Sequence, residues 1–322
     1  MGTISTINGI AEDNIATHNG GTAALYTSKN GDTWQHFVGM VATGGTITTD
    51  GDYKVHRFAG VGSGTFEITT LGSTPTVWAL IVAGGGGGSG DLGGGGGSGG
   101  LINNTTLSVS ETSYTVVVGN YGAAGGSSRQ SNTLGGDGGD SSFNSQTAIG
   151  GGRGGAYWAS SATQSNGATG GSGGGGGGKD SADSVGGGAT AGQGNIGGTG
   201  GHAGVAHQYA GGGGGGSGGA GLNYTASSTG ATADGGAGTS NSITGSAVIY
   251  AAGGGGNGYA GNAGNGGSSG VGGDGAGDQS WARAGSAGDD NTGSGGGAGA
   301  YGTYMAAYRG GTGVVIIRYK FQ

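Results

Sequence analysis

The stretch from Val77 to Gly100 reads VWALIVAGGGGGSGDLGGGGGSGG, an apolar run that passes directly into glycine. A strand followed by G-x-G-x-x-G is typical of dinucleotide-binding domains, in which the glycines open a helix. Each glycine costs a helix about 1 kcal/mol relative to alanine, so the residues after Ala83 cannot form that helix. The same spacing recurs throughout the chain because glycine is everywhere. We therefore interpret these glycines as scaffold and predict no nucleotide site.

Glycine dominates the whole composition. It accounts for 97 of 322 residues, whereas charged residues make up only 8%. Such a composition is typical of periodic fibrous proteins or of flexible linkers. Flexible linkers are poor in aromatic residues, however, and this chain has 13 Tyr, 5 Phe and 4 Trp. We therefore expect an ordered protein.

Charge and cysteine content exclude several classes of function. The formal net charge is −7, so no basic surface is expected and nucleic acid is not predicted as a partner. The chain has no cysteine, which excludes disulfides and thiolate metal sites. The residues after Met1, GTISTINGI, lack the basic and apolar regions of a signal peptide, so none is expected. No apolar run reaches membrane-spanning length, and membrane insertion is not predicted.

We expect three regions, the first two being an N-terminal segment and a β domain. Residues 1–29 contain the related hexapeptides ISTING and IATHNG, a pattern that suits anchoring or oligomerisation. Residues 30–83 contain runs such as DYKVHRFAG, SGTFEITT and TVWALIVA, which predict a small antiparallel β-sandwich. Residues 313–320 form another apolar, β-branched run, and we predict that this C-terminal strand returns to the sheet and pairs with TVWALIVA.

The third expected region is the glycine-rich domain, residues 84–312. Between Gly258 and Gly273, glycine recurs at every third position. Polyglycine II, which resembles polyproline II, has three residues per turn, so this period leaves one face of each helix bare for a close neighbour. Collagen also has period three, but a single proline excludes it. The predicted fold is therefore mostly β, with a bundle of polyglycine II helices after the β domain.

Motifs for catalysis or metal binding are weak. GGGGGGKD resembles a phosphate loop, but Asp180 replaces the hydroxyl residue that would meet magnesium. GGDGGDSSF offers Asp137 and Asp140 as calcium candidates, but a single imperfect copy of a stacking repeat is more typical of turn caps. His202 and His207 are close in sequence and could hold a metal, although a surface pair is the simpler interpretation. We predict no enzyme activity, no cofactor and no metal.

Aromatic and histidine-containing inserts between the glycine runs carry the main functional signal. If the runs stack as rods, their connections gather at the rod ends and display side chains to solvent. Tyr, Trp and Arg on a rigid scaffold dominate binding hot spots. The alternative is that they plug the ends of the bundle. The candidates are Tyr157, Trp158, His202, His207, Tyr209, Tyr224, Trp281, Tyr301, Tyr304, Tyr308 and Arg309.

This alternation of glycine motifs and inserts resembles the glycine-rich tail-fibre adhesins of tailed bacteriophages. The segments that carry the resemblance are VWALIVAGGGGG, YTVVVGNYGAAGG, GGDGGDSSF, AIGGGRGG and GGTGVVIIRY. It implies a polyglycine sandwich whose distal loops contact an outer-membrane protein or glycan of the host, in a virion assembled in the host cytoplasm.

The resemblance also implies that the N-terminus contacts other virion proteins. Two arrangements stay open: the chain caps another fibre, or it forms the fibre itself as a homotrimer. The other function that fits is a structural fibre or capsid decoration protein in which the glycine bundle is a rigid spacer.

Overall fold

The computed structural model describes most of the chain after residue 36. The described ranges are 37–126, 134–157, 162–179, 183–202, 209–225, 233–258, 263–267, 270–277, 283–300 and 306–322. Before residue 37 only four short strands are described: β1 (Thr6–Ile7) pairs with β2 (Ile10–Ala11), and β3 (Tyr26–Thr27) pairs with β4 (Thr33–Trp34). The rest of the predicted N-terminal segment, residues 1–29, lies outside the described residues.

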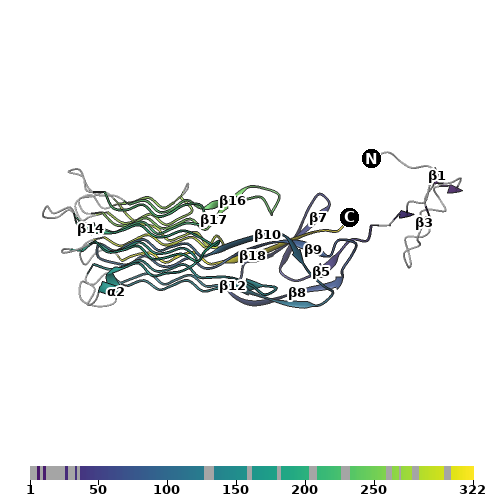
Figure 1. The fold of residues 1–322 in the computed structure, drawn as a ribbon, viewed down its shortest axis with the longest axis horizontal. Coiled ribbons are helices and arrows are strands. Elements are labelled where there is room, and N and C mark those ends of the chain that lie inside the picture. Colours follow the sequence, from purple (N-terminus) through teal and green to yellow (C-terminus); the bar gives the residue numbers. More distant parts are fainter. Residues whose placement is uncertain are drawn as a thin grey trace.

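The described residues are mostly β, with almost no helix, and two five-stranded antiparallel sheets lie at one end of the glycine-rich segments (Figure 1). The first sheet has the order β10-β9-β18-β7-β6 and the second β13-β12-β11-β8-β5. The strands of the first are β6 (Thr46–Asp50), β7 (Tyr53–Phe58), β9 (Thr76–Val82), β10 (Leu101–Ser108) and β18 (Val314–Lys320). The strands of the second are β5 (Val41–Thr43), β8 (Gly62–Thr70), β11 (Ser113–Val118), β12 (Ser141–Phe143) and β13 (Gln146–Ala148).

The predicted return of the C-terminal strand is confirmed. β18 pairs antiparallel with β9, with Val315 opposite Ile81 and Ile317 opposite Ala79, and it pairs on its other side with β7. Both strands are buried on both faces over most of their length, which explains why their sequences are continuously apolar rather than alternating. The glycine region therefore begins and ends at adjacent strands of one sheet.

The two sheets enclose one apolar core, and a second core lies on the outer face of the first sheet. Phe66 of β8 and Phe143 of β12 pack edge to face at 5.8 Å between ring centroids, and both belong to the core that includes Ile317 of β18. On the outer face, Ile243 and Tyr250 pack against Leu80, Val314 and Ile316. Tyr250 belongs to the hairpin of β16 (Thr239–Asn241) and β17 (Val248–Tyr250), which covers part of this face.

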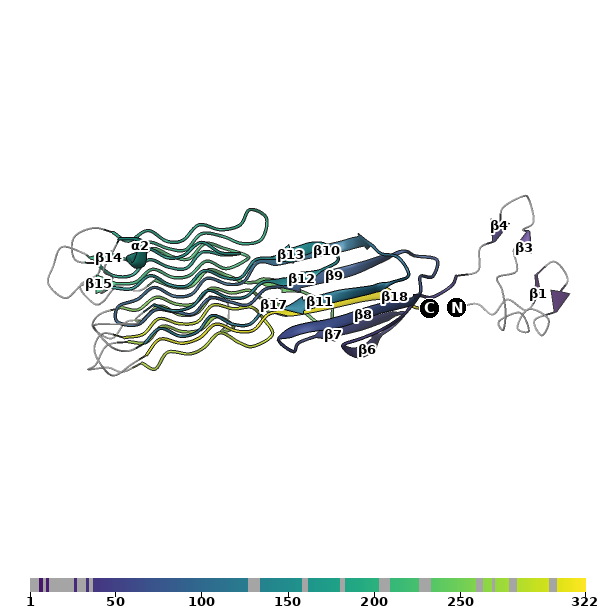
Figure 2. The same cartoon turned by 90° about the horizontal axis from the view of Figure 1, so that it is seen from below.

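Four strands that complete the sheets follow the predicted boundary between residues 83 and 84. β10 pairs with β9, and β11 pairs with β8 and β12. The sheets and the glycine region therefore alternate along the sequence, and the chain passes from one to the other several times (Figure 2).

Beyond the sheets, the glycine segments run back and forth as extended, closely spaced chains (Figures 1 and 2). Their backbone hydrogen bonds follow a period of three, so that every third residue donates to the same neighbouring segment. The six successive bonds from residues 95–100 are Gly95 to Gly212, Gly96 to Gly296, Gly97 to Gly152, Ser98 to Gly215, Gly99 to Gly293 and Gly100 to Ile149, with N···O distances of 2.8–3.0 Å. Within this glycine array, residues 95–100 thus donate to three neighbouring segments in rotation and accept from three others, those of Gly86, Gly254 and Ser172, whereas a strand in a sheet bonds two neighbours.

Close backbone approach explains why the array requires glycine. A Cβ atom added at Gly94, Gly95, Gly96 or Gly97 would lie under 3.0 Å from backbone atoms of another segment. These atoms cannot move aside as the end of a side chain could, so an alanine would force whole segments apart. Two of the exceptions inside the array are serines: Ser98 and Ser172 are fully buried, and their hydroxyl oxygens lie 2.9 Å apart.

The stretch with strict period-three glycine, Gly258 to Gly273, is not one straight segment. Its described part turns at Gly270, where φ is +84°, and the Gly272 N–H reaches back to the Gly267 carbonyl. Sequence period alone does not reveal this, because glycine adopts the turn and the extended conformation with similar ease. The described part of the chain contains no helix with the length and apolar character needed to span a membrane.

Candidate functional site

The candidate site lies at the end of the glycine array farthest from the sheets. Three described elements mark this end: α2 (Ala162–Ser165), β14 (Gly201–His202) and β15 (Tyr209–Ala210) (Figures 1 and 2). β14 and β15 pair antiparallel, with His202 directly opposite Tyr209. The pairing therefore brings two of the predicted site residues together at this end.

Three predicted site residues form one aromatic cluster there. The rings of His202 and Tyr209 are stacked, with centroids 4.5 Å apart and planes 20° apart. Tyr157 meets Tyr209 edge to face at 5.4 Å, and all three side chains are half-buried. Edge-to-face and offset pairs are favourable ring arrangements, worth about 0.5–1.5 kcal/mol beyond the area that they bury. The cluster is thus held in a defined geometry while each of the three residues stays partly exposed.

Tyr224 is attached to this cluster through hydrogen bonds. Its hydroxyl donates to Asp183 Oδ1 at 3.1 Å and lies 3.4 Å from the backbone oxygen of His202. Its ring packs directly on Gly201, where a Cβ would collide with it. Burial, and then the hydrogen bond and negative charge of Asp183, raise the pKa of the Tyr224 hydroxyl, so Tyr224 remains a neutral donor at physiological pH.

A buried turn supports the cluster from inside the array. Asp91 and Leu92 are fully buried, and both have positive φ, 49° and 57°, a conformation that is uncommon for residues other than glycine. The Gly178 N–H donates to the Leu92 carbonyl at 2.9 Å, and a Cβ at Gly178 would touch both Leu92 O and Tyr209 Cβ at 3.4 Å. Close packing against Gly178 therefore fixes the position of the Tyr209 Cβ atom.

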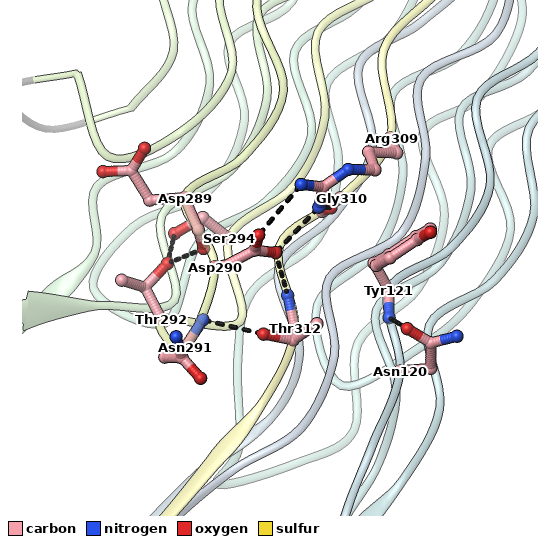
Figure 3. Close-up of polar contacts among 10 residues, drawn as sticks. All are labelled: Asn120, Tyr121, Asp289, Asp290, Asn291, Thr292, Ser294, Arg309, Gly310 and Thr312. Carbon is pink, nitrogen blue, oxygen red and sulfur yellow. Dashed lines mark hydrogen bonds and ion pairs between the residues drawn. The ribbon is translucent and has the colours of Figure 1, made fainter. Parts of the chain in front are cut away.

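Tyr308 and Arg309 make their contacts elsewhere. Tyr308 is built into the array through backbone bonds to Gly88 and Gly297. Arg309 holds Asp290 with two hydrogen bonds of 2.7 and 2.9 Å (Figure 3), and its guanidinium carbon lies 4.5 Å from the Tyr121 ring centroid. Asp290 lies in the turn at residues 290–293, and its carboxylate also accepts from the Thr312 N–H at 3.2 Å, so the ion pair holds this turn against the segment that leads into β18.

The charges around this ion pair perturb one another. Hydrogen bonding to Arg309 lowers the pKa of the Asp290 carboxyl and in turn raises the pKa of the Arg309 guanidinium. Burial, together with the negative charge of Asp290, raises the pKa of Asp289. Thr292 donates to the Asp289 backbone oxygen at 2.6 Å and fixes the turn (Figure 3). These contacts stabilise the turn, so Arg309 and Asp290 have a structural role.

The remaining predicted residues divide into two groups. Trp158, His207, Trp281, Tyr301 and Tyr304 lie outside the described residues. Asp137 and Asp140, the calcium candidates, accept hydrogen bonds from the backbone N–H groups of Arg153 and Gly150 at 2.9 and 2.7 Å. Among the described residues, no three His, Asp or Glu side chains are grouped so that they could hold a metal ion.

Most of the chain matches a known protein family. A family model described as a glycine-rich domain matches residues 59–320. The chain belongs to this family. The matched part of the glycine-rich domain begins directly after β7 and ends with the last residue of β18, so it includes both the array and most of the sheets. No curated protein matches the chain.

Sequence reasoning missed two contributors to the site of this glycine-rich domain. Asp183 follows a glycine run without any motif, and only the array brings it to Tyr224. The turn at Asp91 and Leu92 was visible as an interruption of the glycines, but nothing local relates it to Tyr209. The assembled site brings together partly exposed aromatic residues, a phenol hydroxyl and one carboxylate, which suits binding through stacking and hydrogen bonds.

Proposed function

We propose that the glycine segments are polyglycine II helices and that the two sheets form a β-sandwich at their base. The three-residue hydrogen-bond period between residues 95 and 100 supports this assignment, because a helix with three residues per turn directs successive N–H groups to three neighbours. The apolar core enclosed by the two sheets supports the sandwich. The bundle acts as a rigid spacer between the sandwich and the far end.

We further propose that the protein is a receptor-binding protein of a bacteriophage tail fibre, without enzyme activity. Its N-terminal segment joins other virion proteins, and its far end contacts a protein or glycan on the host surface. The observation that carries this proposal is the cluster of Tyr157, His202 and Tyr209, which lies at the end of the array opposite the sheets. A rigid base lowers the ordering cost of binding, and aromatic anchors supply most of the binding energy.

Competition for adsorption tests this proposal. Purified protein should bind host cells saturably and inhibit adsorption of the phage that encodes it. Tyr209→Ala should weaken cell binding by about tenfold or more, as expected for a central aromatic anchor. Tyr121→Ala is the matched control, because Tyr121 is a partly exposed tyrosine on the side of the array, beneath Arg309. Exchange of residues 155–170 for those of a related phage should change host range.

The structural alternative gives different results in the same experiments. A spacer or capsid decoration protein would be present in many copies on the capsid, and the purified chain would not inhibit adsorption. Immunogold labelling of intact particles distinguishes the two locations directly. Absence of label from the tail, or unchanged adsorption at saturating protein, contradicts the receptor-binding proposal.

A further inference from the structure

A second, independent site lies on the outer face of the first sheet, away from the aromatic cluster. A cavity of about 380 Å³ opens there over β9 and β18, beside the part of the face that the β16–β17 hairpin covers. This volume lies within the range of small-molecule pockets. Its lining includes Trp78, Arg318 and Lys320.

The centre of the cavity is rigidly built. Arg318 lies opposite Trp78 in the register of β18 and β9. Its guanidinium donates to Asp50 Oδ2 at 2.7 Å and to the Ile243 carbonyl at 3.1 Å, and lies 4.3 Å from the Tyr53 ring centroid. The Trp78 indole N–H donates to Asn103 Oδ1 at 2.6 Å, which fixes the ring plane. An aromatic platform therefore stands beside a cation whose position is set by the protein.

The chemistry of the rim complements this platform. Thr74, Thr76 and Thr105 supply hydroxyl groups around the opening. Lys320 is exposed, its ammonium lies 5.1 Å from the Phe37 ring centroid, and within the described part of the chain it forms no ion pair. Arg318, by contrast, is already paired with Asp50. The net positive charge available to a ligand is therefore that of Lys320.

We propose that this cavity binds a saccharide unit that carries a carboxylate. The C–H face of the sugar ring stacks on Trp78, the threonine hydroxyls exchange hydrogen bonds with its hydroxyl groups, and Lys320 pairs with the carboxylate. A peptide added as a strand needs an open sheet edge, whereas β9 and β18 are both paired on each side. The site is independent of the receptor-binding proposal, which concerns the other end of the molecule.

Titration with small probes tests the assignment. The probes are sodium D-glucuronate, D-glucose and a tri-glutamate peptide, and the signal is the indole N–H resonance of Trp78, assigned by its absence in Trp78→Phe. Glucuronate should shift this resonance saturably at millimolar concentrations and bind more tightly than glucose. Lys320→Ala should weaken glucuronate binding by about threefold at low salt, as for an exposed ion pair, and leave glucose binding unchanged.

Lys54→Ala is the matched control. Lys54 precedes Val55 on β7, on the opposite face of the same sheet, so its removal changes the net charge equally without touching the cavity. It should leave glucuronate binding as it is. Three outcomes overturn the proposal: no saturable shift with either sugar, equal affinity for glucose and glucuronate, or tighter binding of the peptide.

Discussion

Alanine at Gly96 should destabilise the whole glycine array. Gly96 is buried, its N–H donates to Gly296 and its carbonyl accepts from Gly254, both at 2.9 Å. A Cβ at this position would lie 2.6 Å from the carbonyl carbon of Gly86 and nearer still to its oxygen. The substitution therefore drives the segment of Gly86 away from that of Gly96.

The size of the effect follows from the displacement required. To reach an ordinary contact of 3.4 Å, the Gly86 carbonyl carbon must move by at least about 0.8 Å, since it starts at 2.6 Å and the carbonyl oxygen starts nearer still. The same movement would lengthen the 2.9 Å bond from Gly86 N to Gly97 O to about 3.7 Å, which is no longer a hydrogen bond. Two buried backbone groups lose their partners, at a cost of about 1–3 kcal/mol each. We therefore expect a loss of about 2–6 kcal/mol, against a total stability of about 5–15 kcal/mol for ordinary domains.

Urea unfolding measures this loss, with Gly219→Ala, in a partly exposed bend of the same glycine region, as the control. A Cβ at Gly219 would meet only Ala237, at 3.4 Å from its N atom and 3.7 Å from its Cβ, which are ordinary contacts. That substitution should change the free energy of unfolding by less than about 1 kcal/mol. If the two variants unfold within about 1 kcal/mol of each other, the argument that glycine serves close backbone packing is wrong.

Three further predictions concern titration and the candidate site. His56 is fully buried, and burial lowers its pKa below 6.5. The contribution of His56 to the free energy of unfolding should therefore be constant above pH 6.5 and fall as the pH drops below it. His56→Gln should flatten this slope in urea titrations at several pH values. Asp290→Asn should cost about 0–1 kcal/mol at neutral pH, as for a partly exposed ion pair. Because the pKa of Asp290 is lowered in the folded state, this difference should be present above pH 3.8 and disappear as the pH falls through the folded pKa. Tyr224→Phe should retain the fold and weaken cell binding, because it removes a hydroxyl group that we place in the receptor contact. Unchanged cell binding would show that the Tyr224 hydroxyl only stabilises the site through its hydrogen bond with Asp183.

The sheets were predictable from sequence where the pattern is local. The runs around Trp78 and Ile316 are apolar and β-branched, and their positions on either side of the glycine region indicated the pairing of β9 with β18. The run around Tyr114 has the β-branched content of a strand, but its pairing with β8 does not follow from its sequence, because the local pattern does not specify which distant strand it meets. The finer arrangement of the array depends on such distant pairings throughout.

The candidate site was predictable by residue type and only partly by position. Aromatic interruptions of the glycine runs led to Tyr157, Tyr209 and Tyr224, which the structure brings together. The same criterion selected Arg309, which instead binds Asp290 near the sheets. A side chain in an interruption can face the far end or fill the flank of the array. Which of the two occurs depends on the segment's neighbours and not on its own sequence.

The position of residues 84–100 in the array has a consequence for biosynthesis. Gly85 donates to Gly311, Gly88 to Tyr308 and Gly96 to Gly296, so this segment bonds with segments that are synthesised much later. Contacts so distant in sequence slow folding, because the loop must close before they form. In the nascent chain, the glycine hairpin of residues 84–100 therefore lacks these partners until β18 is synthesised and pairs with β9. The glycine runs have low hydrophobicity, so the unpaired hairpin exposes polar backbone to water and few apolar side chains that would promote aggregation.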